Sequence, residues 1–334
     1  MRPRLAIALT AAVLSAAFVS PALLSGQVPV YRDFLNVFLP ERLYAARAFE
    51  AGQWPLWAPE PGLGVAFLAS YQPAPLLPLA AIVYLLPGPA GIGLFLALHF
   101  ALAGIGVSLL LERYGAAPEA RLFAAITYAF GGVFVSIAAW GHLTVAALLP
   151  LVLLAVEDVA RRASRGAFVL LVALLATQAL AGAPESFAQS VALVAAAAAW
   201  IALRERRAAP IPSLAAALAL ALGVTAAQLV PAAEAVLLSE RSGGLGEAAV
   251  LRHSLEPVTF RTLVVPHRID GGVVGAVAEE EFPLVWSIYI GLVPLLFATA
   301  GAVAPGGWPW VAALAVALAF ALGGNAPFLP LVHG

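Results

Sequence analysis

An aspartate in the first polar stretch of the chain is the strongest candidate for chemistry. The sequence has only three aspartates, and Asp33 lies beside Arg32, a few residues after the first apolar segment. Desolvation at a membrane surface raises the pKa of a carboxyl group, which would let Asp33 accept a proton near neutral pH. The structural alternative is that Asp33 caps the helix that follows, since aspartate is a preferred N-cap residue. The residues alone support the two roles about equally.

Further polar candidates stand in short segments between apolar runs and in one later polar stretch. They are His142 in Trp-Gly-His-Leu-Thr, Glu185 in Ala-Gly-Ala-Pro-Glu-Ser, and His267, Arg268 and Asp270. Arginine suits a phosphate group because its planar guanidinium can form two parallel hydrogen bonds. A solvated surface charge is the simpler explanation for any one of the cationic candidates taken singly, and Glu185 is explained equally well as an acid in the first turn of a helix. His99 lies within an apolar run, where a hydrogen bond to a neighbouring helix is its commoner role.

The composition indicates a polytopic membrane protein. The chain has 334 residues, of which 63% are hydrophobic and 10% charged, whereas a soluble domain carries about a quarter charged residues. The net charge of −1 argues against a nucleic-acid partner. The absence of cysteine excludes disulfides, thiolate metal sites and thiol catalysis.

Apolar runs of roughly 20 residues predict about nine transmembrane helices in one all-α membrane domain, residues 1–334. We expect them at Leu5–Ser25, Ala90–Leu111, Leu122–Ala139, Leu143–Val156, Ala167–Leu180, Phe187–Leu203, Pro212–Val230, Leu284–Val303 and Trp308–Leu322. We interpret the first run as an uncleaved helix rather than a signal peptide, because many spans follow it.

The distribution of arginine decides the topology. If Leu76–Leu86 does not cross the membrane, the arginine-bearing short loops all fall on the side of the N-terminus, as the positive-inside rule requires. This favours a juxtamembrane or re-entrant segment at 76–86 over a true span. Two long external segments then result, 26–76 and 234–283, and every polar candidate except His99 emerges on the outer face. Residues 34–49 mix apolar and charged side chains, which predicts an amphipathic interfacial helix.

Several stretches resemble the YfhO-like bacterial membrane proteins. They are Arg-Asp-Phe-Leu-Asn-Val-Phe-Leu-Pro from Arg32, Gly52-Gln-Trp-Pro-Leu-Trp, Gly62-Leu-Gly-Val-Ala-Phe-Leu-Ala, and Val265-Pro-His. The resemblance covers nearly the whole chain and is most specific in the first external segment. It implies a glycosyltransferase of the GT-C superfamily in the bacterial cytoplasmic membrane, with two juxtamembrane helices in the first external loop.

The resemblance further implies the reaction and the role of Asp33. A sugar would pass from a polyprenyl-phosphate carrier to a glycan or another envelope acceptor on the outer face, with Asp33 as catalytic base. From their shared outer face, and not from the resemblance, we expect substrate binding by a further set of residues: Arg32, His142, Glu185, His267, Arg268 and Asp270. A divalent metal near Asp33 and His142 is compatible with this site, but no ligand spacing demands one.

The chain also departs from the family pattern. Superfamily members often carry a second acidic residue beside the first or in the second external loop, and this chain offers only His142 in the latter. Relatives often carry glutamine at the position of Glu185. The family architecture usually continues beyond the residue that ends this sequence, so we expect an N-terminal portion of a longer architecture. Two other functions stay open: a transporter or lipid flippase, which predicts broken helices or ionisable groups near the midplane, and a non-catalytic envelope scaffold.

Overall fold

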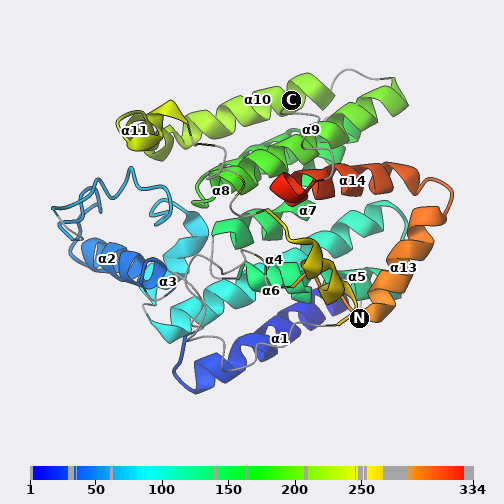
Figure 1. The fold of residues 1–334 in the computed structure, drawn as a ribbon, viewed down its shortest axis with the longest axis horizontal. Helices are drawn as coiled ribbons and strands as arrows, with labels where there is room; N and C mark the ends of the chain where they lie inside the picture. Colours follow the sequence, from blue (N-terminus) through cyan, green and yellow to red (C-terminus); the bar gives the residue numbers. More distant parts are fainter. Residues whose placement is uncertain are drawn as a thin grey trace. The chain divides into compact units, whose positions relative to one another are not determined.

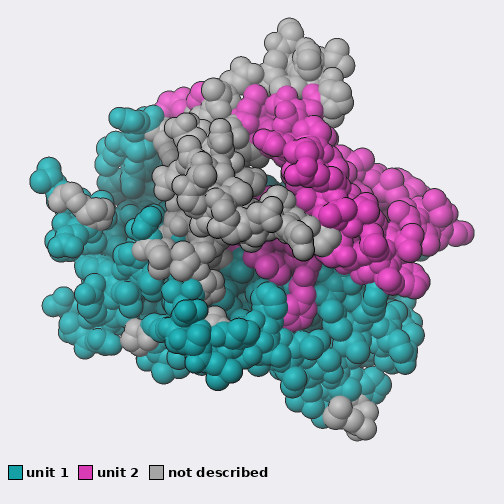
Figure 2. Space-filling model, turned by 60° about the horizontal axis from the view of Figure 1, so that its bottom comes forward, with its two compact units in different colours: residues 1–129, 138–242 teal, residues 130–137, 243–334 magenta. Residues whose placement is uncertain are grey.

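The computed structural model describes residues 3–28, 34, 36–60, 63–86, 88–138, 141–162, 164–206, 210–244, 246, 251, 254–265, 285 and 287–326. Over these residues the protein is helical, and the only β-type pairing described is one bridge between Ala58 and Val65. The chain divides into two compact units (Figure 2). Unit 1 comprises Met1–Ala129 and Ala138–Ser242, and unit 2 comprises Phe130–Ile137 and Gly243–Gly334.

The helices of unit 1 run as in Figure 1. They are α1 (Pro3–Leu24), α2 (Phe38–Glu50), η2 (Pro78–Ala80), α3 (Ala81–Leu85), α4 (Pro89–Arg113), α5 (Pro118–Phe130, its last residue in unit 2), α7 (Gly141–Arg162), α8 (Arg165–Ala179), α9 (Pro184–Glu205), α10 (Pro210–Val224), α11 (Ala226–Leu237) and η3 (Glu240–Gly243, its last residue in unit 2). Those of unit 2 are α6 (Gly132–Ser136), η4 (Pro257–Leu263), α13 (Leu292–Val303), α14 (Trp308–Leu322) and η6 (Gly323–Asn325).

Small residues let the helices of unit 1 approach closely. Helix α4 packs against α1 and α7, and at Gly104 an added methyl group would already touch Ala11 at 3.5 Å. A core cluster joins α7, α8, α9 and α10 around fully buried leucine, valine and alanine side chains. Alanine and glycine at such interfaces favour the close packing that drives helix association in membranes.

Five described helices are long and apolar enough to cross a membrane, namely α1, α4, α7, α9 and the run from Trp308 to Asn325. The count rises to six if α10 and α11, which meet at an 80° bend, form one broken span. The protein is therefore a multi-pass membrane protein, but the predicted count of about nine spans is not confirmed.

Three breaks account for much of the difference. The expected helix 122–139 is interrupted at Gly131, which separates α5 from α6. The expected helix 284–303 begins only at Leu292, after Gly291 with φ of +97°. The expected helix 212–230 breaks at Thr225, whose hydroxyl bonds back to the carbonyl groups of Ala221 and Leu222. Helix α8, with 15 residues, is also shorter than a usual span.

The first long loop contains the expected short helices. Helix α2 covers most of the predicted amphipathic segment and begins four residues later than residue 34. Its N-cap is Val37, without a side-chain capping bond. Asp33 lies outside the described residues, so both roles considered for it stay predictions. Helices η2 and α3 together are too short to cross a bilayer, as expected for 76–86.

Candidate functional site

One end of unit 1 gathers the starts of α7 and α9 with the first long loop. Helices α2, α3 and α11 lie at this same end, on the left of Figure 1. At Gly141 a methyl group would collide with the carbonyl oxygen of Ala181. At Gly182, whose φ is +81°, it would lie 2.9 Å from the carbonyl oxygens of Tyr71 and Gln72. Glycine at these two positions lets three segments distant in sequence meet.

Two sequence-predicted residues, His142 and Glu185, come together at this junction. The Nε2 atom of His142 lies 3.4 Å from Oε1 of Glu185, and its Nδ1 atom lies 2.7 Å from the hydroxyl of Ser186. The His142 side chain is 15% exposed and that of Glu185 is 59% exposed, so the carboxylate remains open to a ligand. We call His142, Glu185 and Ser186 the His142 cluster.

Tyr71 links the cluster to the first long loop. Its hydroxyl donates to the carbonyl oxygen of Ala179 at the end of α8. Burial, and to a lesser degree the charge of Glu185, raise the pKa of Tyr71 to about 12. Tyr71 is therefore a neutral hydrogen-bond donor at physiological pH.

Buried hydrogen bonds hold the helices beneath the cluster. Gln178 of α8 donates through Nε2 to the carbonyl of Val145 in α7, at 2.9 Å, and its Oε1 accepts from the hydroxyl of Ser190 in α9, also at 2.9 Å. One amide side chain thus ties three helices together. His99 of α4 makes contacts of 2.6 Å to the Phe95 carbonyl and 2.9 Å to the Thr144 hydroxyl, so it has the hydrogen-bonded role expected for a lone histidine.

The other predicted site residues lie outside the described residues. They are Arg32, Asp33, His267, Arg268 and Asp270. Among the residues that the structure does describe, no group of three or more His, Asp or Glu side chains could hold a metal ion. The metal proposed beside Asp33 stays a prediction.

Sequence reasoning missed Ser186, Tyr71 and the neighbours Glu41 and Arg42 of α2. Ser186 was signalled only by its position after Glu185, and Tyr71 by its place in the first long loop. Glu41 and Arg42 look in sequence like ordinary charges of an amphipathic helix. The structure buries one carboxylate oxygen of Glu41 without a hydrogen-bond partner among the described residues.

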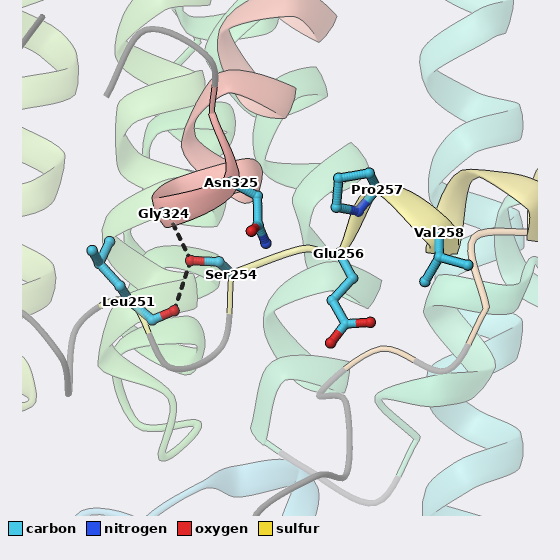
Figure 3. Close-up of a pocket in the computed structure, with 7 residues that line it drawn as sticks. All are labelled: Leu251, Ser254, Glu256, Pro257, Val258, Gly324 and Asn325. Carbon is cyan, nitrogen blue, oxygen red and sulfur yellow. Dashed lines mark hydrogen bonds between the residues drawn. The ribbon is translucent and has the colours of Figure 1, made fainter. Parts of the chain in front are cut away.

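Unit 2 has a separate cleft of about 490 Å³ (Figure 3). Its polar lining consists mainly of Ser254, Glu256 and Asn325. The Ser254 hydroxyl donates to the Leu251 carbonyl at 2.7 Å and accepts from the Gly324 N–H at 2.8 Å, as the dashed lines show. Asn325 donates to the Leu255 carbonyl at 3.2 Å. These two side chains serve to close the local structure, and neither of the described site residues, His142 and Glu185, is among the lining residues.

Comparison with known families identifies the protein's relatives. The model of the family described as bacterial membrane protein YfhO matches residues 42–305. The chain belongs to the YfhO family. Searches of curated proteins and of solved structures return no match. Within this YfhO-family protein, the match includes α2 from Arg42 onward, the rest of the first long loop, and the His142 cluster; Asp33 and Glu41 precede it.

Proposed function

We propose that this YfhO-family protein transfers a sugar from a polyprenyl-phosphate carrier to an acceptor on the outer face of the bacterial cytoplasmic membrane. The observation that carries the proposal is the His142 cluster at the end of the helical unit where the first long loop folds. A polar group set over an apolar bundle suits a substrate with a lipid tail and a polar head. Family membership supports the same reaction class.

The proposed reaction is a single inverting displacement. The acceptor hydroxyl oxygen attacks the anomeric carbon while Asp33 takes the hydroxyl proton. The bond between the anomeric carbon and the phosphate oxygen breaks, and its electron pair leaves with the polyprenyl phosphate. Arg32 or Arg268 neutralises the leaving phosphate, and His142 with Glu185 hydrogen-bonds the sugar. General base catalysis is worth roughly 10²–10⁴-fold in rate, and electrostatic stabilisation of the leaving group can contribute a similar factor.

The rival transport function has one observation in its favour. Broken helices mark substrate sites in many transporters, and α10 and α11 meet at an 80° bend. The break follows 15 residues of α10, or about 22 Å at 1.5 Å per residue, which is past the centre of a hydrocarbon core of about 30 Å. His99, the ionisable residue in the apolar part of α4, is already hydrogen-bonded. The geometry therefore favours the transferase.

The deciding experiment measures sugar transfer by purified protein in lipid vesicles that contain a polyprenyl-phosphate sugar. Asp33→Asn should lower transfer by about 10²–10⁴-fold and leave donor binding unchanged. The matched control is Glu60→Gln, an exposed carboxylate of the same loop. Equal transfer by Asp33→Asn and wild type would remove Asp33 from the chemistry. Donor movement across the bilayer without transfer would replace the enzyme by a transporter.

A further inference from the structure

Glu41 and Arg42 of α2 are neighbours in sequence and interact electrostatically, but not as a hydrogen-bonded ion pair. Their side chains leave the helix about 100° apart, and no ion pair joins them in the described part of the chain. Oε2 of Glu41 is shielded from solvent and finds no hydrogen-bond partner among the described residues. Two charged groups therefore stand side by side with unmet hydrogen-bonding capacity.

The guanidinium of Arg42 is part-buried and only partly satisfied. Its Nη1 donates to the Phe38 carbonyl at 3.2 Å, and its central carbon lies 5.5 Å from the centre of the Phe38 ring. A guanidinium has five N–H donors, and within the part of the chain that the structure describes no carboxylate lies within ion-pair distance of Arg42. A buried charge without a counter-ion is costly, so an anion that fills this place would bind favourably.

Among the described residues, the titratable groups that interact with the pair, Tyr84 and His99, supply no negative charge near neutral pH. Tyr84 of α3 faces both residues, and burial raises its pKa to about 12, so it remains neutral. Its hydroxyl is 3.3 Å from each of the carbonyl oxygens of Pro73 and Ala74. His99 of α4, which interacts electrostatically with Arg42, brings no negative charge either. Burial also raises the pKa of Glu41 to about 7, against the opposing effect of Arg42.

The pair lies near the candidate site. Tyr84 contacts both α2, through a ring contact of 5.3 Å with Phe49, and the loop at Pro73 and Ala74. The preceding residues of this loop, Tyr71 and Gln72, abut Gly182 beside the His142 cluster. Tyr84 and this loop therefore connect α2 to the neighbourhood of the His142 cluster.

We propose that Arg42 and protonated Glu41 together bind the phosphate of a lipid monophosphate, the class of product released by the proposed transfer. Arg42 offers two parallel N–H groups to two phosphate oxygens. Glu41 in its acid form donates its O–H to a third oxygen, which gives its buried oxygen a partner. The exposed Trp54, whose ring packs edge-on against Phe49, is suited to interfacial depth, where the phosphate of a lipid lies. The inference rests on the proposed function for the identity of the lipid.

Proton linkage follows from this geometry. A bound phosphate next to Glu41 raises the pKa of that carboxyl above the value of about 7 that it has in the protein without ligand. Binding above pH 7 must then take up one proton, so affinity falls as pH rises, by up to about tenfold per pH unit. Below pH 7 the acid form already prevails and this dependence disappears.

The test is direct binding of farnesyl monophosphate to purified protein in phosphatidylcholine nanodiscs, between pH 6 and pH 9. Arg42→Gln should weaken binding by about 10–100-fold because hydrogen bonds to charged groups are lost. Arg42→Lys keeps the positive charge, so it should weaken binding less than Arg42→Gln and should still fold. Some loss of affinity is expected because lysine lacks the planar guanidinium that forms two parallel hydrogen bonds. The matched control Arg47→Gln removes an exposed arginine of the same helix and should bind like wild type.

Glu41→Gln separates the proton effect from the charge. Its amide donates a hydrogen bond at every pH, so this variant should keep its affinity near pH 6 and lose the extra fall above pH 7. The titration of the phosphate itself affects both proteins equally and cancels in the comparison. Parallel pH profiles for wild type and Glu41→Gln would overturn the role of Glu41.

The remaining arms identify the ligand. Equal binding by Arg42→Gln and Arg47→Gln would overturn the site. If inorganic phosphate competes at the same concentration as farnesyl monophosphate, the site binds free phosphate and the lipid assignment is overturned. Farnesol, which lacks the phosphate, should not compete. Because binding is measured without transfer, a wild-type protein that binds the probe but transfers no sugar would disprove the proposed function and leave this site intact.

Discussion

Replacing Gln178 by leucine should loosen the three helices that carry the candidate site. Gln178 is fully buried, and its amide joins α7 through Val145 and α9 through Ser190, each at 2.9 Å. Leucine has a similar volume, so the substitution removes hydrogen bonds without opening a large cavity. Hydrogen bonds between membrane helices average about 0.6 kcal/mol and reach about 1.7 kcal/mol. Two of them predict a loss of about 1–3 kcal/mol in the free energy of unfolding.

The assay is reversible unfolding of the purified protein in mixed micelles, with Thr177→Val as the matched control. Thr177 is the preceding residue, and among the described residues its hydroxyl bonds to the Ala173 carbonyl of its own helix. Thr177→Val should therefore change the unfolding free energy by less than about 0.5 kcal/mol. A double-mutant cycle with Ser190→Ala isolates one of the two bonds and should give a coupling of about 0.6–1.7 kcal/mol. Equal stability of Gln178→Leu and Thr177→Val, or strict additivity in the cycle, would refute the reasoning.

Two further substitutions should change the stability of the protein in opposite directions. Gln228 of α11 is fully buried, and neither its Oε1 nor its Nε2 has a hydrogen-bond partner among the described residues. Gln228→Leu should therefore raise the melting temperature or leave it unchanged. A clear fall, measured against the exposed control Gln189→Leu, would show that the amide is paired. Gly141→Ala should cost about 1–3 kcal/mol of unfolding free energy, because its methyl group meets the Ala181 backbone. Gly223→Ala, which meets nothing within 4 Å, should be neutral or slightly stabilising, and equal melting of the two alanine variants would contradict the predicted collision.

The sequence predicted best the helices that are apolar without interruption. Helix α14 matches its expected bounds, and α4 differs by one or two residues at each end. The short segment at 76–86 was also predicted correctly as non-spanning, because arginine placement reports on topology independently of hydropathy. The expected ends failed where charged residues continue a helix. Helix α7 runs on to Arg162 because Asp158 pairs with Arg113 at 2.6 Å and with Arg162 at 3.4 Å.

Hydropathy could not reveal the breaks or the contacts of the site. An average over a window is the same for a straight helix and for α10 and α11, which meet at 80° around Thr225. One-sided topology predicted that His142 and Glu185 share a face, but their approach to 3.4 Å depends on how α7 and α9 pack. Whether Arg42 meets a carboxylate depends in the same way on tertiary structure. The roles of Asp33 and its partners stay predictions.

Charge pairing distinguishes Arg42 from several other arginines of unit 1. Arg4 and Arg121 both reach Glu112, at 2.8 and 2.9 Å, and Arg161 reaches Glu205 at 3.0 Å. These pairs join different helices, and each of these arginines has a carboxylate as its counter-ion. Arg42 has no such partner in the described part of the chain, although Glu41 is its neighbour and the pair is part-buried. A charge held out of water is costly unless a counter-ion pairs with it. Because the same helical unit pairs these other arginines, the lack of a carboxylate partner for Arg42 among the described residues is better explained by a ligand than by stability.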